Sequence, residues 1–185
     1  MYSPPRMAQP NPSQRVHGAR PIVLVGLMGA GKSTVGRRLA SRLSLPFVDA
    51  DTEIETAAGM TVSEIFAKFG EPYFRDGERR VIARLIDGRP KVIATGGGAF
   101  VNDETRDLIL TQATAIWLDA DLRVLAERVK RRDTRPLLSG RDPLPVLREL
   151  AAVRNPLYAL AHIRVPSANA PHEVTVAAIL KELGK

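Results

Sequence analysis

The sequence predicts an α/β fold in which helices cover both faces of a five-stranded parallel sheet. Short apolar runs alternate with segments whose apolar residues recur at helical spacing, and this order is typical of parallel sheets. The chain of 185 residues is 44% hydrophobic, which is enough for one well-buried core. Residues 26–33 form a complete G-x-x-x-x-G-K-[ST] motif between the first strand and the first helix. These three observations together indicate a phosphate-loop (P-loop) nucleotide-binding fold.

The first strand and the first helix are the most clearly marked elements. Residues 21–25 are an uninterrupted apolar run, as in a strand that is buried on both faces. Val35, Leu39 and Leu43 follow at helical spacing and predict a helix over 32–44. The same two patterns place further strands at 46–49, 91–95, 113–118 and 162–165, and further helices near 52–58 and at 62–69, 72–86, 103–112, 122–132, 144–161 and 172–183.

The chain is expected to hold one domain, residues 21–185, after a leader. Residues 1–20 contain four prolines and almost no apolar side chains, so we expect them to be disordered and dispensable for catalysis. Two later segments are longer than a connection between strand and helix requires. The first is a helical insert at about 50–90, and the second is a polar segment at about 131–143 with the composition of a mobile lid over a nucleotide.

Composition restricts the chemistry. The chain has no cysteine and its three histidines are scattered, so we expect no thiolate or histidine metal site, and any metal should be Mg²⁺ held by oxygen atoms. No apolar run reaches the length of about 18 residues that suggests a membrane helix. The N-terminus also lacks the order of a signal peptide. We therefore expect a cytoplasmic protein that does not contact membranes.

The net charge of +7 raises the question of a nucleic-acid partner. Three arginines in residues 1–20 have no acidic neighbour there, so the rest of the chain carries only +4. Much of that surplus is a cluster between Arg128 and Arg141, which suits a triphosphate as well as a nucleic acid. Aromatic residues make up only 5% of the chain and supply few stacking platforms for bases. Nucleic acid is therefore not an expected partner.

The phosphate loop, residues 26–34, predicts a site for a nucleoside triphosphate. Its three glycines allow backbone N–H groups to turn inward around an anion, and the helix that follows adds the positive end of its dipole. In such loops the lysine, here Lys32, reaches the β- and γ-phosphates, and the following hydroxyl, Ser33, binds Mg²⁺. The residues expected around the phosphates are Gly29, Ala30, Gly31, Lys32, Ser33 and Thr34.

Two carboxylates end the second predicted strand. Alternation along an extended segment would place Asp49 and Asp51 on one face beside the phosphate loop. One of them would support Mg²⁺ through water, and the other would orient the attacking hydroxyl and accept its proton. A simpler interpretation is that one of them caps the next helix. Asp119 also ends an apolar run and is a rival metal carboxylate, but helix-start preference accounts for it, so we favour Asp49.

The insert carries one arginine suited to an anionic substrate. A guanidinium binds a carboxylate through two parallel hydrogen bonds, which makes Arg75 a candidate, although a lone arginine is commonly a solvated surface charge. Gly77 is unexpected inside the predicted helix over 72–86, where glycine costs about 1 kcal/mol relative to alanine. After the third strand, residues 96–98 are three successive glycines, which indicates close approach of a ligand to the backbone.

Two further arginines precede prolines. Arg135 lies in the predicted lid, where it could swing onto the triphosphate and stabilise the transferring phosphoryl group, or could be a surface charge. Arg154 lies two residues before Pro156 in a helical stretch, which restricts its position but does not identify its role.

Together and in this order, these residues resemble the shikimate kinase family. The resemblance runs from about residue 20 to the C-terminus and rests on the phosphate loop, Asp49-x-Asp51, Phe74-Arg75-x-x-Glu78, the three glycines, Arg135-Pro-Leu-Leu and Arg154-x-Pro-Leu-Tyr. It implies a fold like that of the nucleoside monophosphate kinases, with a substrate-binding insert and a lid. It also implies transfer of the γ-phosphate of ATP to the 3-hydroxyl of shikimate, in aromatic amino-acid biosynthesis. The departures are the leader and Gly77.

On the donor side, the resemblance implies that Lys32 stabilises the transferring phosphate and that Ser33 binds Mg²⁺. Asp49 would support the ion through water, and Arg135 would close over ATP.

On the acceptor side, the resemblance implies that Asp51 binds the shikimate hydroxyls and acts as the base. Arg75 and Arg154 would bind the carboxylate, and the backbone of Gly97 would contact the ring hydroxyls. Glu78 would brace these groups without contacting substrate itself.

Two other functions fit parts of the sequence. A small-metabolite kinase of the same fold, such as a gluconate kinase, shares the phosphate loop but leaves the combination of Asp49-x-Asp51, Arg75 and the three glycines without explanation. A basic nucleic-acid-binding NTPase would need a basic face interleaved with aromatic residues, which the sequence lacks. The absence of obvious exposed apolar stripes favours a monomer.

Overall fold

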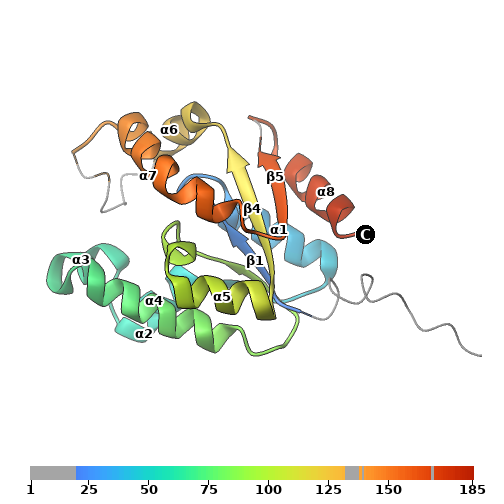
Figure 1. The fold of residues 1–185 in the computed structure, drawn as a ribbon, viewed down its shortest axis with the longest axis horizontal. Coiled ribbons are helices and arrows are strands. Elements are labelled where there is room, and N and C mark those ends of the chain that lie inside the picture. Colours follow the sequence, from blue (N-terminus) through green and yellow to red (C-terminus); the bar gives the residue numbers. More distant parts are fainter. Residues whose placement is uncertain (1–19, 132–137, 139, 168) are drawn as a thin grey trace, which may run out of the picture.

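The computed structural model describes residues 20–131, 138, 140–167 and 169–185. These residues form a parallel five-stranded sheet in the order β2-β3-β1-β4-β5, as the sequence predicts (Figure 1). The strands are β1 (Ile22–Val25), β2 (Phe47–Asp49), β3 (Val92–Ala94), β4 (Thr114–Ala120) and β5 (Ile163–Ser167). All four residues of β1 are buried, because this strand lies at the centre of the sheet. The phosphate loop therefore leaves the sheet from its middle.

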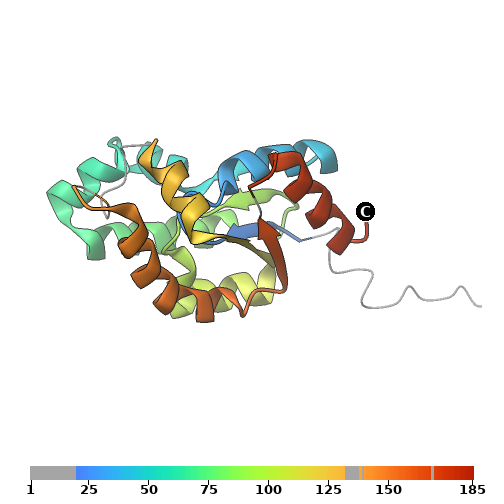
Figure 2. The ribbon, with the colours of Figure 1, turned by 90° about the horizontal axis from the view of Figure 1, so that it is seen from above.

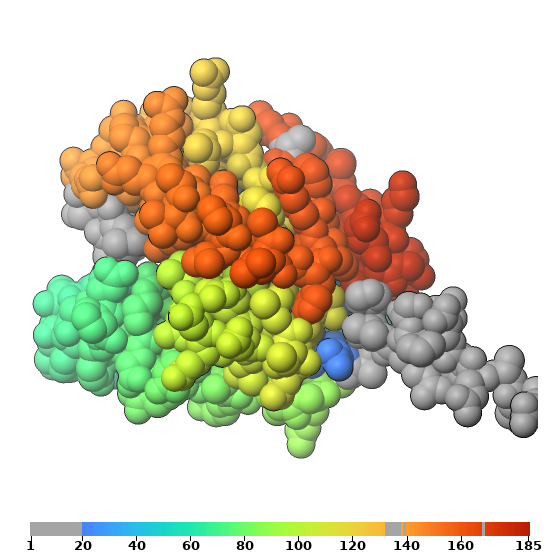
Figure 3. Space-filling view, viewed as in Figure 1, coloured from blue at the N-terminus to red at the C-terminus, as the bar shows by residue number. Residues whose placement is uncertain are grey.

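Helices cover both faces of the sheet. Figure 2 shows α1 and α8 on one face and α5 and α7 on the other. The helices are α1 (Lys32–Leu43), α2 (Ala50–Ala58), α3 (Val62–Phe69), α4 (Glu71–Leu85), α5 (Asp103–Gln112), α6 (Leu122–Lys130), α7 (Pro143–Tyr158) and α8 (His172–Glu182), with a short 3₁₀ turn, η2 (Ala99–Val101). The insert predicted at about 50–90 corresponds to α2, α3 and α4. In the space-filling view this insert, in teal and green, lies below α6 and α7, in yellow and orange (Figure 3).

Of the apolar residues whose spacing predicts α1, Val35 and Leu39 are buried in the core, and Leu43 is partly buried and packs against it. In α4 the buried apolar side chains are those of Phe74, Val81, Ile82 and Leu85, which lie on one side of the helix. At the edge of the sheet β5 alternates between buried and exposed residues, and it tolerates Pro166 because an edge strand has one unpaired side. Within the described part of the chain no helix is both long and apolar enough to cross a membrane.

Several boundaries differ from the sequence prediction. The prediction that β4 ends at residue 118 was wrong, because pairing with β5 extends it to Ala120. The prediction that the helix before β5 runs to residue 161 was also wrong. It ends at Tyr158, because the N–H groups of Leu160 and Ala161 bond to carbonyls only three residues back, as in a tight final turn. The leader up to residue 19 and most of the expected lid lie outside the described residues.

Candidate active site

The phosphate loop adopts the conformation that its glycines allow. Gly26 has a φ of 144°, and a Cβ there would lie 2.7 Å from the carbonyl oxygen of Leu118, so another residue at this position meets both strain and collision. Lys32 begins α1 and is buried. Its ammonium donates hydrogen bonds to the carbonyl oxygens of Gly26 at 2.6 Å and Leu27 at 2.9 Å. The lysine is thus held inside the loop that would hold the phosphates.

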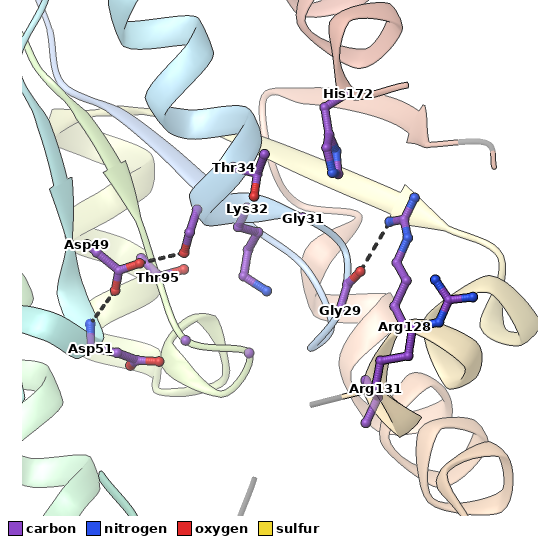
Figure 4. A pocket seen from close by; sticks show the side chains of 14 residues that line it. Gly29, Gly31, Lys32, Thr34, Asp49, Asp51, Thr95, Arg128, Arg131 and His172 are labelled. Carbon is purple, nitrogen blue, oxygen red and sulfur yellow. Dashed lines mark hydrogen bonds between the residues drawn. The ribbon is translucent and has the colours of Figure 1, made fainter. Parts of the chain in front are cut away.

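A pocket of about 280 Å³ opens beside this loop. Figure 4 shows Asp49, Asp51 and Thr95 on one side of the loop, and Arg128, Arg131 and His172 on the other. The pocket is lined by Gly29, Gly31, Lys32, Ser33, Thr34, Asp49, Asp51, Thr95, Gly96, Gly97, Arg128, Val129, Arg131 and His172. One wall therefore carries carboxylates and the other carries guanidinium and imidazole groups.

Asp49 has two roles in the structure. It ends β2 and caps α2, because its Oδ1 accepts hydrogen bonds from the N–H groups of Asp51 at 3.0 Å and Thr52 at 3.3 Å. Its Oδ2 accepts a 2.5 Å hydrogen bond from the hydroxyl of Ser33. A carboxylate oxygen and a hydroxyl oxygen thus meet at the base of the phosphate loop. These hard oxygen donors suit Mg²⁺, which needs few protein ligands when phosphates supply the others.

The sequence argument for Asp51 was wrong in its geometry. We expected an extended segment to place both carboxylates on one face, but the capping bonds of Asp49 turn the chain into a helix immediately after it. Asp51 therefore lies in the first turn of α2, where the helix dipole favours a negative charge. Both side chains still line the pocket.

Glu78 lies beside Asp51 at the glycine turn, which is the name used here for Gly96, Gly97 and Gly98. A Cβ at Gly96 would lie 3.0 Å from Asp51 Oδ1 and 3.1 Å from Glu78 Oε2, so the missing side chain makes room for both carboxyl groups. Glu78 is only 3% exposed. Burial raises its carboxyl pKa, and the charge of Asp51 adds to the rise, while Arg75 and Arg154 oppose it.

Arg75 is held by acidic neighbours on its own helix. It donates a 2.9 Å hydrogen bond to Glu78 Oε1 and a weaker one to Glu71 Oε1 at 3.3 Å. Its guanidinium also lies 5.1 Å from the centre of the Phe74 ring. A Cβ at Gly98 would fall 2.4 Å from this guanidinium, so only glycine lets Arg75 reach this position.

Arg154 is a buried cation. Its residue surface is only 7% exposed, and in the described part of the chain no carboxylate lies within ion-pair distance of it. One of its guanidinium nitrogens lies 3.1 Å from the position that a Cβ of Gly97 would take. A buried charge without an ionic partner is costly. An anionic ligand at the glycine turn would supply that partner.

The rival carboxylate, Asp119, has a different role. It lies within β4 and accepts hydrogen bonds of 2.9 Å and 2.5 Å from Arg164, whose guanidinium also lies 5.0 Å from the centre of the Trp117 ring. It does not line the pocket. Asp121, two residues later, caps α6. Neither residue belongs to the candidate site.

Some site residues were not found from the sequence. His172 lies at the start of α8, and its ring would be 3.0 Å from a Cβ at Gly31. Tyr158 appeared in the sequence only as the last residue of the Arg154-x-Pro-Leu-Tyr motif, without a role, and it donates a short hydrogen bond to the carbonyl oxygen of Gly97. Arg128 was visible only as part of a basic cluster, and it donates a 3.2 Å hydrogen bond to the carbonyl oxygen of Gly29. Arg135, proposed for the lid, lies outside the described residues.

The chain is similar to known proteins over most of its length. A family model described as "Shikimate kinase" matches residues 28–184. A shikimate kinase of Caulobacter vibrioides is 62% identical over 165 residues, covering 89% of this chain and 82% of that protein. The structure of a shikimate kinase from Acinetobacter baumannii in complex with shikimate superposes with a TM-score of 0.87 at 36% identity, covering 93% of this chain and 97% of the other.

The alternative kinase of the same fold is more distant. A gluconokinase from Sinorhizobium meliloti superposes with a TM-score of 0.58 at 22% identity, covering 92% of this chain and 94% of the other, which shows a shared fold only. The relatives at high identity and the match over most of the sequence agree with each other. This chain belongs to the shikimate kinase family.

Proposed function

We propose that this protein transfers the γ-phosphoryl group of ATP to the 3-hydroxyl of shikimate, giving shikimate 3-phosphate and ADP. The observation that carries this proposal is the buried Arg154, which has no carboxylate within ion-pair distance in the described part of the chain and lies against the glycine turn. Arg75 lies against the same turn, and Asp51 and the phosphate loop lie beside it. A small acceptor with one carboxylate and several hydroxyls fits these groups. Family membership supports shikimate as that acceptor.

On the donor side, the phosphate loop would hold the triphosphate through the backbone N–H groups around Gly29 and Gly31 and through Thr34. The ammonium of Lys32 would exchange its two carbonyl partners for phosphate oxygens and neutralise charge on the transferring group. Ser33 would bind Mg²⁺ directly and Asp49 through water. When bound there, Mg²⁺ would offset the negative charge of the phosphates.

The rest of the triphosphate would face the basic wall of the pocket. Arg128 and Arg131 line this wall together with His172. Their positive charge attracts a polyanion and offsets the repulsion among its negative charges within the pocket. Arg135 from the lid would complete the neutralisation of charge in the transition state.

On the acceptor side, Arg75 and Arg154 would bind the shikimate carboxylate from two sides. A guanidinium offers two parallel donors to a carboxylate, so two of them would fix both the position and the plane of the group. The backbone N–H of Gly97 would donate to a ring hydroxyl. Asp51 would accept the proton of the 3-hydroxyl while the oxygen of that hydroxyl attacks the γ-phosphorus. Glu78, through its bond to Arg75, would keep that guanidinium in place.

We further propose that the protein acts in the cytoplasm as a monomer, in the biosynthesis of chorismate and the aromatic amino acids. The leader would not contribute to catalysis.

Coupled measurement of ADP release tests the proposed reaction. Shikimate, gluconate and a set of nucleoside monophosphates are offered separately as acceptors, with ATP and Mg²⁺ constant. We expect shikimate alone to raise the rate well above the background hydrolysis of ATP. Stimulation by gluconate or by a nucleotide, with none by shikimate, would contradict the proposal.

A further inference from the structure

Tyr158 is a buried residue to which the reaction above assigns no part. It is completely buried at the C-terminal end of α7, and its ring packs near those of Phe100 and Trp117, with centroid distances of 6.3 Å and 5.9 Å. Its hydroxyl donates a short hydrogen bond to the carbonyl oxygen of Gly97. Burial raises the pKa of Tyr158 to about 12, so the hydroxyl keeps its proton and remains a donor at neutral pH.

The bond holds the carbonyl of Gly97, the residue whose own N–H would donate to the acceptor. The carbonyl of Gly97 and the N–H of Gly98 belong to one planar trans peptide, so they point in opposite directions. When Tyr158 holds the carbonyl toward the core, the N–H of Gly98 must point away from it. In the part of the chain that the structure describes, neither Gly97 nor Gly98 donates its N–H to another protein group. Gly97 lines the pocket, so its N–H remains available to a ligand there.

Glycine makes such an anchor necessary. Three successive glycines have no side chains to restrict their dihedral angles, so their peptides rotate more readily than others unless an outside group holds them. The neighbouring hydrogen bonds of the turn are backbone bonds from Ala99 to Gly96 and from Val101 to Gly98, and neither uses the peptide between Gly97 and Gly98. The Tyr158 hydroxyl is the group that reaches this peptide.

The same helix also supplies Arg154. Residues four apart lie on one face of an α-helix, so Arg154 and Tyr158 project from α7 toward the same turn. The Arg154 guanidinium approaches the Cα side of Gly97, and the Tyr158 hydroxyl binds its carbonyl. Helix α7 thereby positions both the Arg154 guanidinium and the peptide beside it.

We propose that Tyr158 is a positioning residue for the acceptor site, which holds the peptide between Gly97 and Gly98, and with it Gly97 itself, so that the N–H of Gly97 and the Arg154 guanidinium meet the substrate hydroxyls and carboxylate together. This inference rests on the proposed function for the identity of the acceptor. The anchoring of the peptide by Tyr158 is independent of that function.

The variant Tyr158→Phe removes the hydroxyl and keeps the ring. We expect the KM for shikimate, and its dissociation constant without ATP, to rise about tenfold, as for loss of one buried hydrogen bond. The KM for ATP should stay within about twofold, because the donor side does not use this peptide. Ile179→Val, in the buried face of α8, serves as a control that loses stability without touching the turn. It should change neither constant.

A second measurement separates this inference from the proposed function. In protein labelled with ¹⁵N-glycine and free of ligands, the amide signals of Gly97 and Gly98 should shift and exchange with solvent faster in Tyr158→Phe than in the parent or in Ile179→Val. Unchanged glycine signals, or an equal rise in KM for both substrates, would overturn the positioning role. Absence of turnover with shikimate in the parent protein would instead overturn the proposed function, and the glycine signals would still decide the anchoring.

Discussion

The guanidinium of Arg75 packs against the Cα of Gly98, so closely that a single added methyl group would lie 2.4 Å from it. The two residues come from different elements, the insert helix α4 and the turn after β3. Gly98 itself has a negative φ, with φ −92° and ψ −8°, angles that are open to alanine as well as to glycine. The requirement for glycine is therefore entirely spatial.

Gly98→Ala should consequently displace Arg75 while leaving the backbone intact. We expect the KM for shikimate to rise about 10- to 100-fold, as for a misplaced binding group, with the KM for ATP nearly unchanged. Steady-state kinetics with each substrate varied in turn measures this.

Gly77→Ala is a matched control on the helix that carries Arg75. A Cβ there meets nothing within 4 Å, and alanine favours a helix interior by about 0.5–1 kcal/mol. We expect the Tm to rise by about 1–4 °C with unchanged KM values. A similar loss of shikimate binding in both glycine variants would show that the collision with Arg75 is not the cause.

From the burial of Arg154 we predict that its replacement stabilises the substrate-free protein but weakens shikimate binding. Because its buried charge has no carboxylate within ion-pair distance in the described part of the chain, Arg154→Met should raise the Tm of the substrate-free protein. The same variant should weaken shikimate binding at least about 100-fold and abolish the rise in Tm that shikimate gives to the parent. Thermal denaturation with and without shikimate measures both effects. A Tm of the substrate-free variant below that of the parent would mean that Arg154 stabilises the fold and does not depend on an anionic ligand.

The carboxyl of Glu78 predicts a pH dependence of stability. Burial raises its pKa in the folded protein above the ordinary value of 4.5, so the neutral form is favoured by folding. The stability that this group contributes is complete below its unfolded pKa and is lost as the pH rises through its higher folded pKa. Glu78→Gln removes this titration. The Tm of the variant should therefore improve relative to the parent as the pH rises above 4.5. If the Tm of the variant instead falls relative to that of the parent as the pH rises, the pKa of Glu78 is lowered in the folded protein and not raised.

Asp49 combines a helix cap with a proposed metal role, and two substitutions separate them. Asp49→Asn keeps a good capping side chain, so the Tm should stay near that of the parent while the Mg²⁺ concentration for half-maximal rate rises about 10- to 100-fold. Asp49→Ala loses both roles and should also cost about 1 kcal/mol of stability. Equal Mg²⁺ requirements in the parent and in Asp49→Asn would remove Asp49 from the metal site.

The sequence predicts the fold well because its signals are local. The apolar run of β1, the glycines of the phosphate loop and the apolar spacing of α1 lie within residues 21–44, and each determines its own conformation. The start of α2 was misplaced because a capping bond, from the N–H of Asp51 to Asp49, overrides the extended alternation on which the prediction relied. That bond depends on a turn that periodicity does not describe.

The remaining parts of the site depend on contacts between distant segments. His172 meets the phosphate loop only after α8 has packed against α1, and Tyr158 meets Gly97 across 61 residues of sequence. The three glycines signal a close approach, but the sequence does not say that Gly96, Gly97 and Gly98 face different partners. Those partners are Asp51 with Glu78, then Arg154, then Arg75.

The identity of the phosphorylated hydroxyl tests the central claim most directly. The protein is incubated with shikimate, ATP and Mg²⁺, and the product is analysed by phosphorus–proton correlation NMR. The amount of ADP formed is measured in parallel. We predict that phosphorus couples to the proton on carbon 3 and that one ADP forms for each phosphate transferred. Phosphorus on another hydroxyl, or no phosphorylated shikimate while ATP is consumed, would contradict the account.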